Sequence, residues 1–211
     1  MAKKGAGSSF NTDHALTNAA SLAPAEKKAV FLTFDDGPSR TTHQILDILK
    51  DKQAKAAFFW QGRLVHPQRP ALRVIEEGHT LGSHTHRHPN LTSLSFDKQK
   101  HEIQSSLDSI KSISPAPIEY FRPPYGRYNE ETVRVVNELG LELVMWDTAS
   151  FDWKEKKSPE AILSNVMDTI QPGSIVLLHE LQQTVSILPE LIDLLHKEGY
   201  TCLALPSQRS G

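Results

Sequence analysis

The chain of 211 residues is long enough for one well-buried core, and nothing in its composition indicates a second one. Its 23 basic and 25 acidic residues give a formal net charge of -2, which excludes the basic surface of a nucleic-acid-binding protein and the charge block of a polyanionic tail. The single cysteine, Cys202, excludes an intrachain disulfide and predicts a buried structural thiol. We therefore expect a monomeric one-domain protein with a neutral partner and no nucleic-acid partner.

The N-terminal segment, residues 1–28, is rich in Ala, Ser, Gly, Asn and Lys. It contains no apolar run long enough for a signal-peptide core or a membrane span. We predict that this segment is a flexible leader, part of it a cloning remnant, that residues 29–206 form the folded domain, and that residues 207–211 are a tail.

Beyond the leader, short apolar runs alternate with amphipathic stretches, which predicts β/α units and a largely parallel sheet. The expected strands cover residues 29–34, 56–60, 80–83, 120–122, 141–146, 174–178 and 201–205. The expected helices cover residues 42–51, 95–112 and 129–139, one more begins at Ser158, and a final one ends at Gly199. This spacing fits both a TIM-like barrel and an open doubly wound sheet, and both put functional residues at the C-terminal ends of parallel strands.

Two adjacent carboxylates follow the first expected strand, in the run Thr-Phe-Asp-Asp-Gly-Pro at residues 33–38. Neighbouring side chains that leave a strand point in different directions, so Asp35 and Asp36 can face one site from two angles. One of them could bind a metal ion while the other acts as a base. The alternative is an ordinary Asp-Asp-Gly-Pro surface turn.

A histidine cluster follows the third expected strand, in the run Gly-Ser-His-Thr-His-Arg-His-Pro at residues 82–89. His84 and His88 can converge on one ion, and Asp36 would complete the three protein ligands of a catalytic zinc site. His86 lies two positions from each of them, and we expect it to be a solvated loop histidine. An isolated His-x-x-x-His pair would be weak evidence, but the two aspartates strengthen it.

Five motifs in this order resemble the polysaccharide deacetylases of carbohydrate esterase family 4, the NodB-homology domain. After the aspartate and histidine motifs at residues 33–37 and 84–88, the chain has Arg-Pro-Pro-Tyr at 122–125, Asp-Trp at 152–153 and Leu-Leu-His at 177–179. The resemblance covers residues 29–205 and implies a single α/β domain folded as a distorted (β/α)7 barrel.

Two positions depart from the pattern of that family. Ala149 stands where an aspartate usually precedes the Asp-Trp pair, and Glu180 follows His179 where aspartate is common. Because the resemblance gives the orienting role to Asp152, we expect Ala149 to alter the groove wall and the substrate choice rather than the chemistry. Glu180 is expected to be a variation beside the site.

The resemblance also implies roles for individual residues. The implied ligands of a divalent metal, Zn²⁺ first and Co²⁺ or Ni²⁺ as alternatives, are Asp36, His84 and His88. The implied catalytic residues are a base, the arginine that holds it, an acid and the aspartate that orients this acid: Asp35, Arg122, His179 and Asp152. The backbone N-H of Tyr125 would stabilise the oxyanion, and the implied substrate contacts are Pro124, Tyr125, Trp153 and Leu177.

The substrate leaves the weakest trace in the sequence. Tyr125, Phe151, Trp153 and Trp60 could each stack on sugar or belong to the core. The first expectation is metal-activated hydrolysis of N-acetyl groups on N-acetylglucosamine units of peptidoglycan or chitin-like oligomers. The alternatives are an O-acetyl xylan esterase, a non-catalytic sugar-binding relative and an amidase-like relative. The resemblance implies an extracytoplasmic or cell-wall location, with the native signal or anchor absent from this chain; a cytoplasmic location is the alternative.

Overall fold

The structure, a computed structural model, describes residues 15–23, 28–67, 70–114, 116–155 and 158–207. Its strands are all parallel and lie in the order β5-β4-β3-β2-β1-β7-β6, with β8 paired to the start of β1. These strands are β1 (Ala29–Gly37), β2 (Ala56–Trp60), β3 (Thr80–Ser83), β4 (Tyr120–Phe121), β5 (Glu142–Leu143), β6 (Thr148–Ala149), β7 (Ile175–His179) and β8 (Thr201–Cys202). Seven of them form a curled half-barrel, which confirms the α/β fold of the distorted (β/α)7 type.

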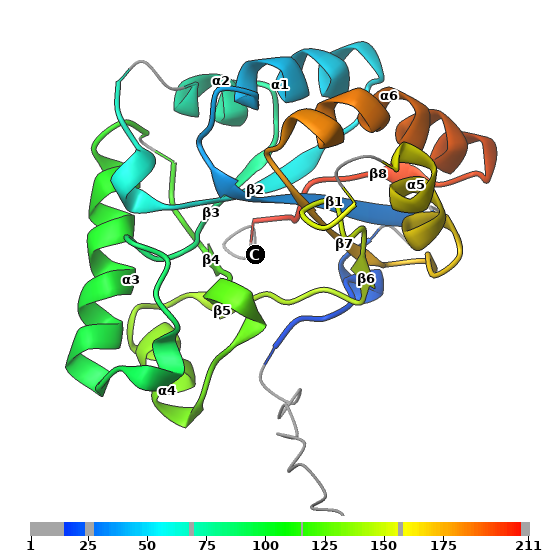
Figure 1. The fold of residues 1–211 in the computed structure, drawn as a ribbon. Coiled ribbons are helices and arrows are strands. Elements are labelled where there is room, and N and C mark those ends of the chain that lie inside the picture. Colours follow the sequence, from blue (N-terminus) through cyan, green and yellow to red (C-terminus); the bar gives the residue numbers. More distant parts are fainter. Residues whose placement is uncertain (1–14, 24–27, 68–69, 115, 156–157, 208–211) are drawn as a thin grey trace, which may run out of the picture.

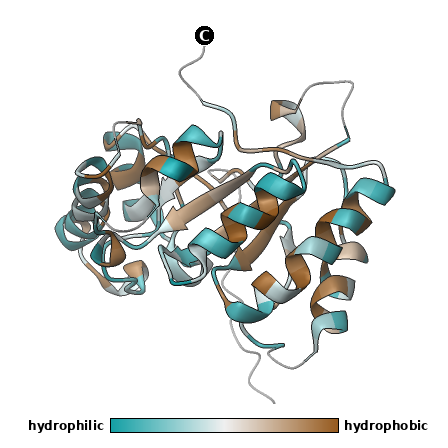
Figure 2. Ribbon diagram, turned by 90° about the horizontal axis from the view of Figure 1, so that it is seen from above, coloured by the Kyte–Doolittle hydropathy of each residue, from teal (hydrophilic) through white to brown (hydrophobic). Residues whose placement is uncertain are grey.

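The helices lie around the outside of the curled sheet (Figure 1). They are α1 (Thr42–Asp51), α2 (Ala71–Glu76), α3 (Phe96–Lys111), α4 (Glu130–Glu138), α5 (Pro159–Met167) and α6 (Gln182–Lys197). Asn129 caps α4 through a capping box with Thr132, as its sequence position predicts. In Figure 2 the helices carry alternating brown and teal stripes, which is the pattern of helices that bury one face against a sheet.

The core has two layers because successive strand residues point to opposite faces. On the helix side, Leu32 and Phe34 of β1 pack with residues such as Leu46 of α1. On the inner side, Phe31 of β1 packs with Phe59 and other strand residues. Strand β1 is thus buried on both faces, which explains its continuous apolar run and fixes the position of the residues that follow it.

A stretch of the expected leader packs against the barrel. Leu16 bridges to Val144 beside β5, and Asn18 bridges to Ser174 beside β7. The chain here approaches Gly173 so closely that a Cβ on that residue would lie 2.4 Å from the backbone nitrogen of Ala20. Residues 16–20 therefore span the gap between the two edges of the sheet, while the domain boundary at residue 29 remains a prediction.

One expected strand is shorter in the structure. Residues 141–146 were expected to form a single strand, but only Glu142–Leu143 pairs with β4, and the next strand, Thr148–Ala149, lies beyond the expected range and pairs with β7. The backbone oxygens of Val144 and Met145 accept hydrogen bonds from the Arg122 guanidinium at 3.4 and 2.8 Å. A buried side chain therefore takes the place of a neighbouring strand at this point.

One smaller expectation also has a structural counterpart. Cys202 is 1% exposed, as predicted for a structural thiol, and burial raises its pKa to about 12. Among the described residues, no helix combines the length and the apolar character that crossing a membrane requires.

Candidate active site

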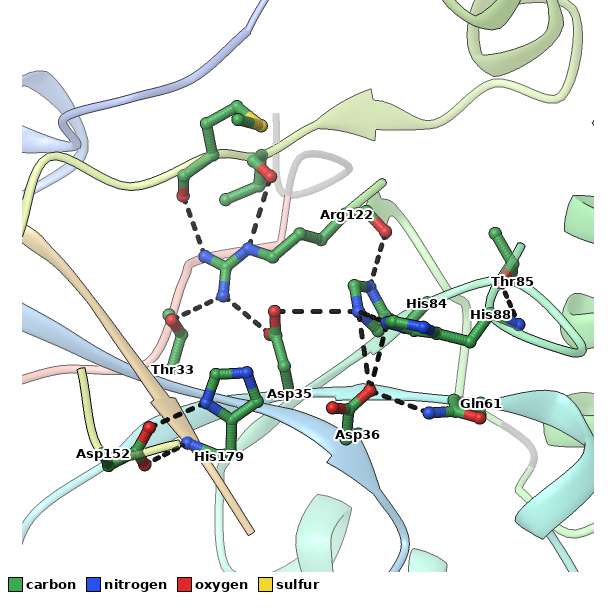
Figure 3. Close-up of polar contacts among 12 residues, drawn as sticks. Thr33, Asp35, Asp36, Gln61, His84, Thr85, His88, Arg122, Asp152 and His179 are labelled. Atoms are coloured by element: carbon green, nitrogen blue, oxygen red, sulfur yellow. Dashed lines mark hydrogen bonds and ion pairs between the residues drawn. The ribbon is translucent and has the colours of Figure 1, made fainter. Parts of the chain in front are cut away.

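The C-terminal ends of the strands bring the motif residues together. Asp35 and Asp36 lie at the end of β1, His84 and His88 follow β3, and His179 ends β7. Figure 3 shows these side chains pointing toward one another. They line one pocket of about 430 Å³, whose other lining residues are Tyr125, Gly126, Trp146, Trp153, Leu177 and Leu181.

Three of these residues could hold a metal ion. One ligand atom from each of Asp36, His84 and His88 lies within 4.8 Å of the other two. The His84 Nε2 atom is 3.8 Å from Asp36 Oδ1, and the His88 Nε2 atom is 3.3 Å from the same oxygen. The other ring nitrogen of His84 bonds to the backbone oxygen of Arg122 at 2.7 Å, which fixes the ring with Nε2 toward the site. His86 is not a member of this group.

The electrostatics of the three residues suit a cation. Burial would raise the pKa of Asp36, but the charges of His84, His88 and His179 and a hydrogen bond from Gln61 outweigh it and hold that pKa below its ordinary value. Burial and the charge of His84 lower the pKa of His88, although Asp36 opposes them. An ionised carboxylate beside a neutral imidazole is the protonation state that metal ligation needs.

Backbone strain is concentrated around the same pocket. Six described residues other than glycine have a positive φ. Five of them adjoin the site: Asp36 (66°), Thr85 (64°), His88 (62°), Tyr125 (60°) and Phe151 (55°). Left-handed backbone costs free energy for such residues and persists where the surrounding structure imposes it, so this clustering marks a functional region.

Asp35 is held by a buried arginine. The Arg122 Nη1 atom donates to Asp35 Oδ1 at 2.8 Å and to Thr33 Oγ1 at 2.7 Å, and Arg122 is completely buried. Burial lowers the pKa of Arg122, while the neighbouring Asp35 charge works against this change. The second Asp35 oxygen, Oδ2, lies 3.8 Å from His84 Nε2, so this carboxylate faces the candidate metal group.

On the opposite side of the pocket, His179 pairs with a buried carboxylate. The Nδ1 atom of His179 is 2.8 Å from Asp152 Oδ1, and its backbone nitrogen donates to Asp152 Oδ2 at 2.7 Å. Burial would lower the pKa of His179, but the hydrogen bond and charge of Asp152 outweigh it and raise that pKa, with Asp35 and Asp36 adding to the effect. The protonated imidazole is thus favoured.

The expected substrate-contact residues have different environments. Tyr125 and Trp153 are exposed at the pocket, and Leu177 is 4% exposed but lines it. Pro124 is buried in the turn that carries Tyr125. Trp60, one candidate for sugar stacking, is completely buried and donates its indole N-H to Glu180 Oε1 at 2.7 Å. It belongs to the core, because this indole at the end of β2 is enclosed by the buried apolar cluster on the helix side of the sheet.

The structure shows where the two residues that depart from the motif pattern, Ala149 and Glu180, lie. Ala149 lies in β6 beside Leu177, and nearby Asp147 bonds to the backbone nitrogen of Ile175 at 2.9 Å rather than facing the pocket. Glu180 is 4% exposed and accepts the backbone N-H of Ser39 at 3.0 Å. It therefore ties the turn after Asp36 to the end of β7.

Sequence motifs did not identify two residues that contact the site. The Gln61 side chain donates to Asp36 Oδ1 at 2.7 Å, and Thr184 donates to Asp152 Oδ2 at 2.6 Å. Gln61 directly follows β2, and this position at the end of a barrel strand was the one available signal.

Comparison with known proteins identifies the family. The family model described as polysaccharide deacetylase matches residues 23–144, which is more than half of the chain. The chain belongs to this family. It is 34% identical over 191 residues to the peptidoglycan-N-acetylglucosamine deacetylase of Bacillus cereus, covering 87% of this chain and 69% of that relative.

Solved structures support the same assignment. The peptidoglycan deacetylase PdaC of Bacillus subtilis is similar with a TM-score of 0.80 and 33% identity, covering 87% of this chain and 90% of the other. A CE4 family pseudoenzyme from Bacillus anthracis is similar with a TM-score of 0.78 and 30% identity, covering 85% of this chain and 64% of the other. Family membership therefore includes both active enzymes and an inactive relative.

Proposed function

We propose that the protein is a metal-dependent hydrolase that removes N-acetyl groups from N-acetylglucosamine units of a polysaccharide. The observation that carries this proposal is the arrangement of one pocket, with the Asp36, His84 and His88 group and Asp35 on one side and the His179–Asp152 pair on the other. Amide hydrolysis needs a base, an acid and charge stabilisation around one carbonyl group, and this pocket offers candidates for each.

The candidate ligands fit a divalent metal of the zinc type. Two imidazole nitrogens and one carboxylate oxygen are the donors of many catalytic zinc sites, which leave a position open for water or substrate. When bound there, such an ion would polarise the acetyl carbonyl and make water a better nucleophile near neutral pH. Zn²⁺ is our first choice, with Co²⁺ or Ni²⁺ as alternatives.

Asp35 is the proposed base. Its Oδ1 atom is occupied by the Arg122 guanidinium, and its Oδ2 atom lies on the His84 side of the pocket. Arg122 would hold the carboxylate in place and aim it, so that Asp35 accepts a proton from the attacking water. The backbone N-H of Tyr125, in a turn whose positive φ sets its direction, is the proposed oxyanion donor, and such donors typically contribute about 3 to 4 kcal/mol.

His179 is the proposed acid. An amine departs from a tetrahedral intermediate only when it is protonated, and the raised pKa of His179 favours the form that can give this proton. Asp152 would orient the imidazole and stabilise its positive charge, as the carboxylate of a catalytic triad does. Pro124 would shape the turn of Tyr125, while Tyr125, Trp153 and Leu177 would form the pocket wall against the sugar.

The candidate substrates are peptidoglycan and chitin-like oligomers, which both contain N-acetylglucosamine. The similarity to a peptidoglycan-N-acetylglucosamine deacetylase supports this choice and supports an extracytoplasmic or cell-wall location. O-acetylated xylan is the second candidate, because the same machinery would cleave an ester more easily than an amide. A non-catalytic role is less well supported, since all the proposed catalytic and metal-binding side chains are present.

The test combines metal binding with acetate release. The purified protein should bind about one divalent ion and release acetate from chitooligosaccharides or peptidoglycan. Asp36→Ala should lower the metal affinity by orders of magnitude, whereas Asp35→Asn should keep the metal and lower turnover about a hundredfold or more. The control is His86→Ala, which should keep both the metal and the activity. A fully active Asp36→Ala protein, or an Asp35→Asn protein that has lost its metal, would contradict these roles.

A further inference from the structure

Three of the four large exposed apolar side chains in the described part of the chain lie at or beside the pocket. Four large apolar residues in the described part of the chain are more than a third exposed: Leu72 (52%), Tyr125 (64%), Phe151 (42%) and Trp153 (39%). Tyr125 and Trp153 line the pocket, and Phe151 adjoins Trp153. A cluster of exposed aromatic rings is unfavourable in water unless something binds to it.

Phe151 extends the aromatic surface beyond the pocket. The ring centroid of Trp153 is 5.0 Å from that of His179, and the centroid of Phe151 is a further 5.2 Å from Trp153. Trp153 lines the pocket, whereas Phe151 does not. The two aromatic rings therefore form a strip that begins at the proposed acid and continues outside the reaction pocket.

The backbone at this position does not explain the phenyl ring. Phe151 has a φ of 55°, and its carbonyl oxygen accepts the backbone N-H groups of Lys154 and Glu155 at 2.9 and 3.0 Å. This turn directs the next residue, Asp152, into the interior. A left-handed position of this kind is best filled by Gly or Asn, and a large aromatic side chain is a costly choice there. The core does not explain the ring either, because 42% of the residue is exposed.

We propose that Phe151 is a binding platform for the sugar ring next to the one that is deacetylated. This inference rests on the proposed function. A pyranose ring with equatorial substituents presents a flat face of C-H groups that carry partial positive charge. The face of an aromatic ring carries partial negative charge and is apolar, so the two surfaces are complementary. Trp153 borders the reacting unit, and Phe151 receives its neighbour in the chain.

The size and surroundings of the strip favour a sugar over a protein partner. Lys154, which follows the two aromatic residues, is exposed, and Glu155 is half-buried, so charged residues come directly after the strip in the chain. A stable protein interface buries roughly 1,200 to 2,000 Å² in total, far more than this strip offers. The strip is also continuous with the pocket through Trp153, as a site for one polymer chain requires.

The test compares oligosaccharides of different lengths. Phe151→Asn removes the ring but suits the left-handed backbone, so the turn that carries Asp152 should remain. It should lower kcat/KM about tenfold on the pentamer of N-acetylglucosamine, in the range of other aromatic stacking contacts, and much less on the dimer. Phe151→Trp should keep the wild-type dependence on length. Leu72→Ala, which removes an exposed apolar side chain on α2, should behave as wild type on every length.

Binding to an inactive protein separates this inference from the proposed function. In an Asp35→Asn background, adding Phe151→Asn should weaken binding of the pentamer about tenfold by calorimetry. An equal loss of kcat/KM on dimer and pentamer, or unchanged pentamer binding, would overturn the platform. If the wild-type protein bound the pentamer through Phe151 but released no acetate, the platform would stand and the proposed function would fail.

Discussion

The carboxylate of Asp152 has every contact that an orienting residue needs. It accepts hydrogen bonds from His179 Nδ1, from the backbone nitrogen of His179 and from Thr184, and it is completely buried. Several donors fix its position, so it can in turn fix the imidazole. The raised pKa of His179 follows from this contact. Burial alone would lower that pKa, but the Asp152 carboxylate at 2.8 Å stabilises the protonated ring by more than burial destabilises it.

The pH dependence of turnover tests this coupling. A protonated His179 is active as the acid, so activity should fall as the pH rises through its pKa, and this basic limb should lie above the ordinary histidine value. Asp152→Asn removes the charge that raises the pKa, so it should move the basic limb to lower pH and lower turnover about a hundredfold or more. The measurement is the pH profile of kcat. The control is Asp168→Asn, which removes an exposed carboxylate at the end of α5 and should leave the pH profile unchanged. If the basic limb of the profile stayed in place in Asp152→Asn, Asp152 would not be the group that raises the pKa of His179.

Gln61 offers a second test at this scale. It donates to Asp36 Oδ1 at 2.7 Å, and Arg63 Nε donates to its Oε1 atom at 3.0 Å, which fixes the direction of the amide. Gln61→Leu keeps much of the side-chain volume but removes the hydrogen bond to Asp36. The affinity for the metal should therefore fall about 10- to 100-fold. Competition with a chelator measures it. The matched control is Gln104→Leu, which removes a similar bond to Asp108 on the surface of α3, and an equal affinity in both variants would rule out the support.

At the scale of elements, local signals in the sequence predicted more than long-range ones. The bounds of α1 and β2 agree with the predicted residues 42–51 and 56–60, since amphipathic spacing and apolar runs are local properties. The early end of the strand expected at residues 141–146 was missed because it depends on Arg122, whose sequence position gives no hint that its guanidinium binds two backbone oxygens there.

The candidate site follows the same rule. The motif histidines and aspartates were predicted to converge, since the C-terminal ends of parallel strands meet at one edge of the sheet. Gln61 and Thr184 were not, because a glutamine after a strand and a threonine in a helix are common, and their role appears only when Asp36 and Asp152 are placed beside them. Trp60 was ambiguous for a similar reason, as its burial depends on the helices that cover β2.

At the scale of the whole molecule, the incomplete barrel is closed by a segment from outside the motifs. Strands β5 and β6 end the ordered sheet, and residues 16–20 lie across the space between them (Figure 1). The backbone of Leu16 bonds to Leu143 and Met145, each at 2.9 Å, and Ala19 bonds to Gly173 at 2.8 Å. Met145 also accepts from Arg122, so this segment supports the residue that holds the proposed base.

Truncation tests this contribution to stability and activity. A chain that begins at Lys28 should lose at least about 3 kcal/mol of unfolding free energy relative to one that begins at Ala15, since each net hydrogen bond contributes about 1 kcal/mol and the three backbone hydrogen bonds of Leu16 and Ala19 are removed. The Asn18 side-chain bond to Asp147 and the burial of Ala19 are lost as well. Urea unfolding measures the difference. The shorter chain should also have a lower kcat, because Arg122 loses part of the support of its Met145 acceptor and the Asp35 carboxylate is held less firmly. Equal stability and equal kcat in the two chains would mean that the contacts of residues 16–20 contribute nothing to the barrel.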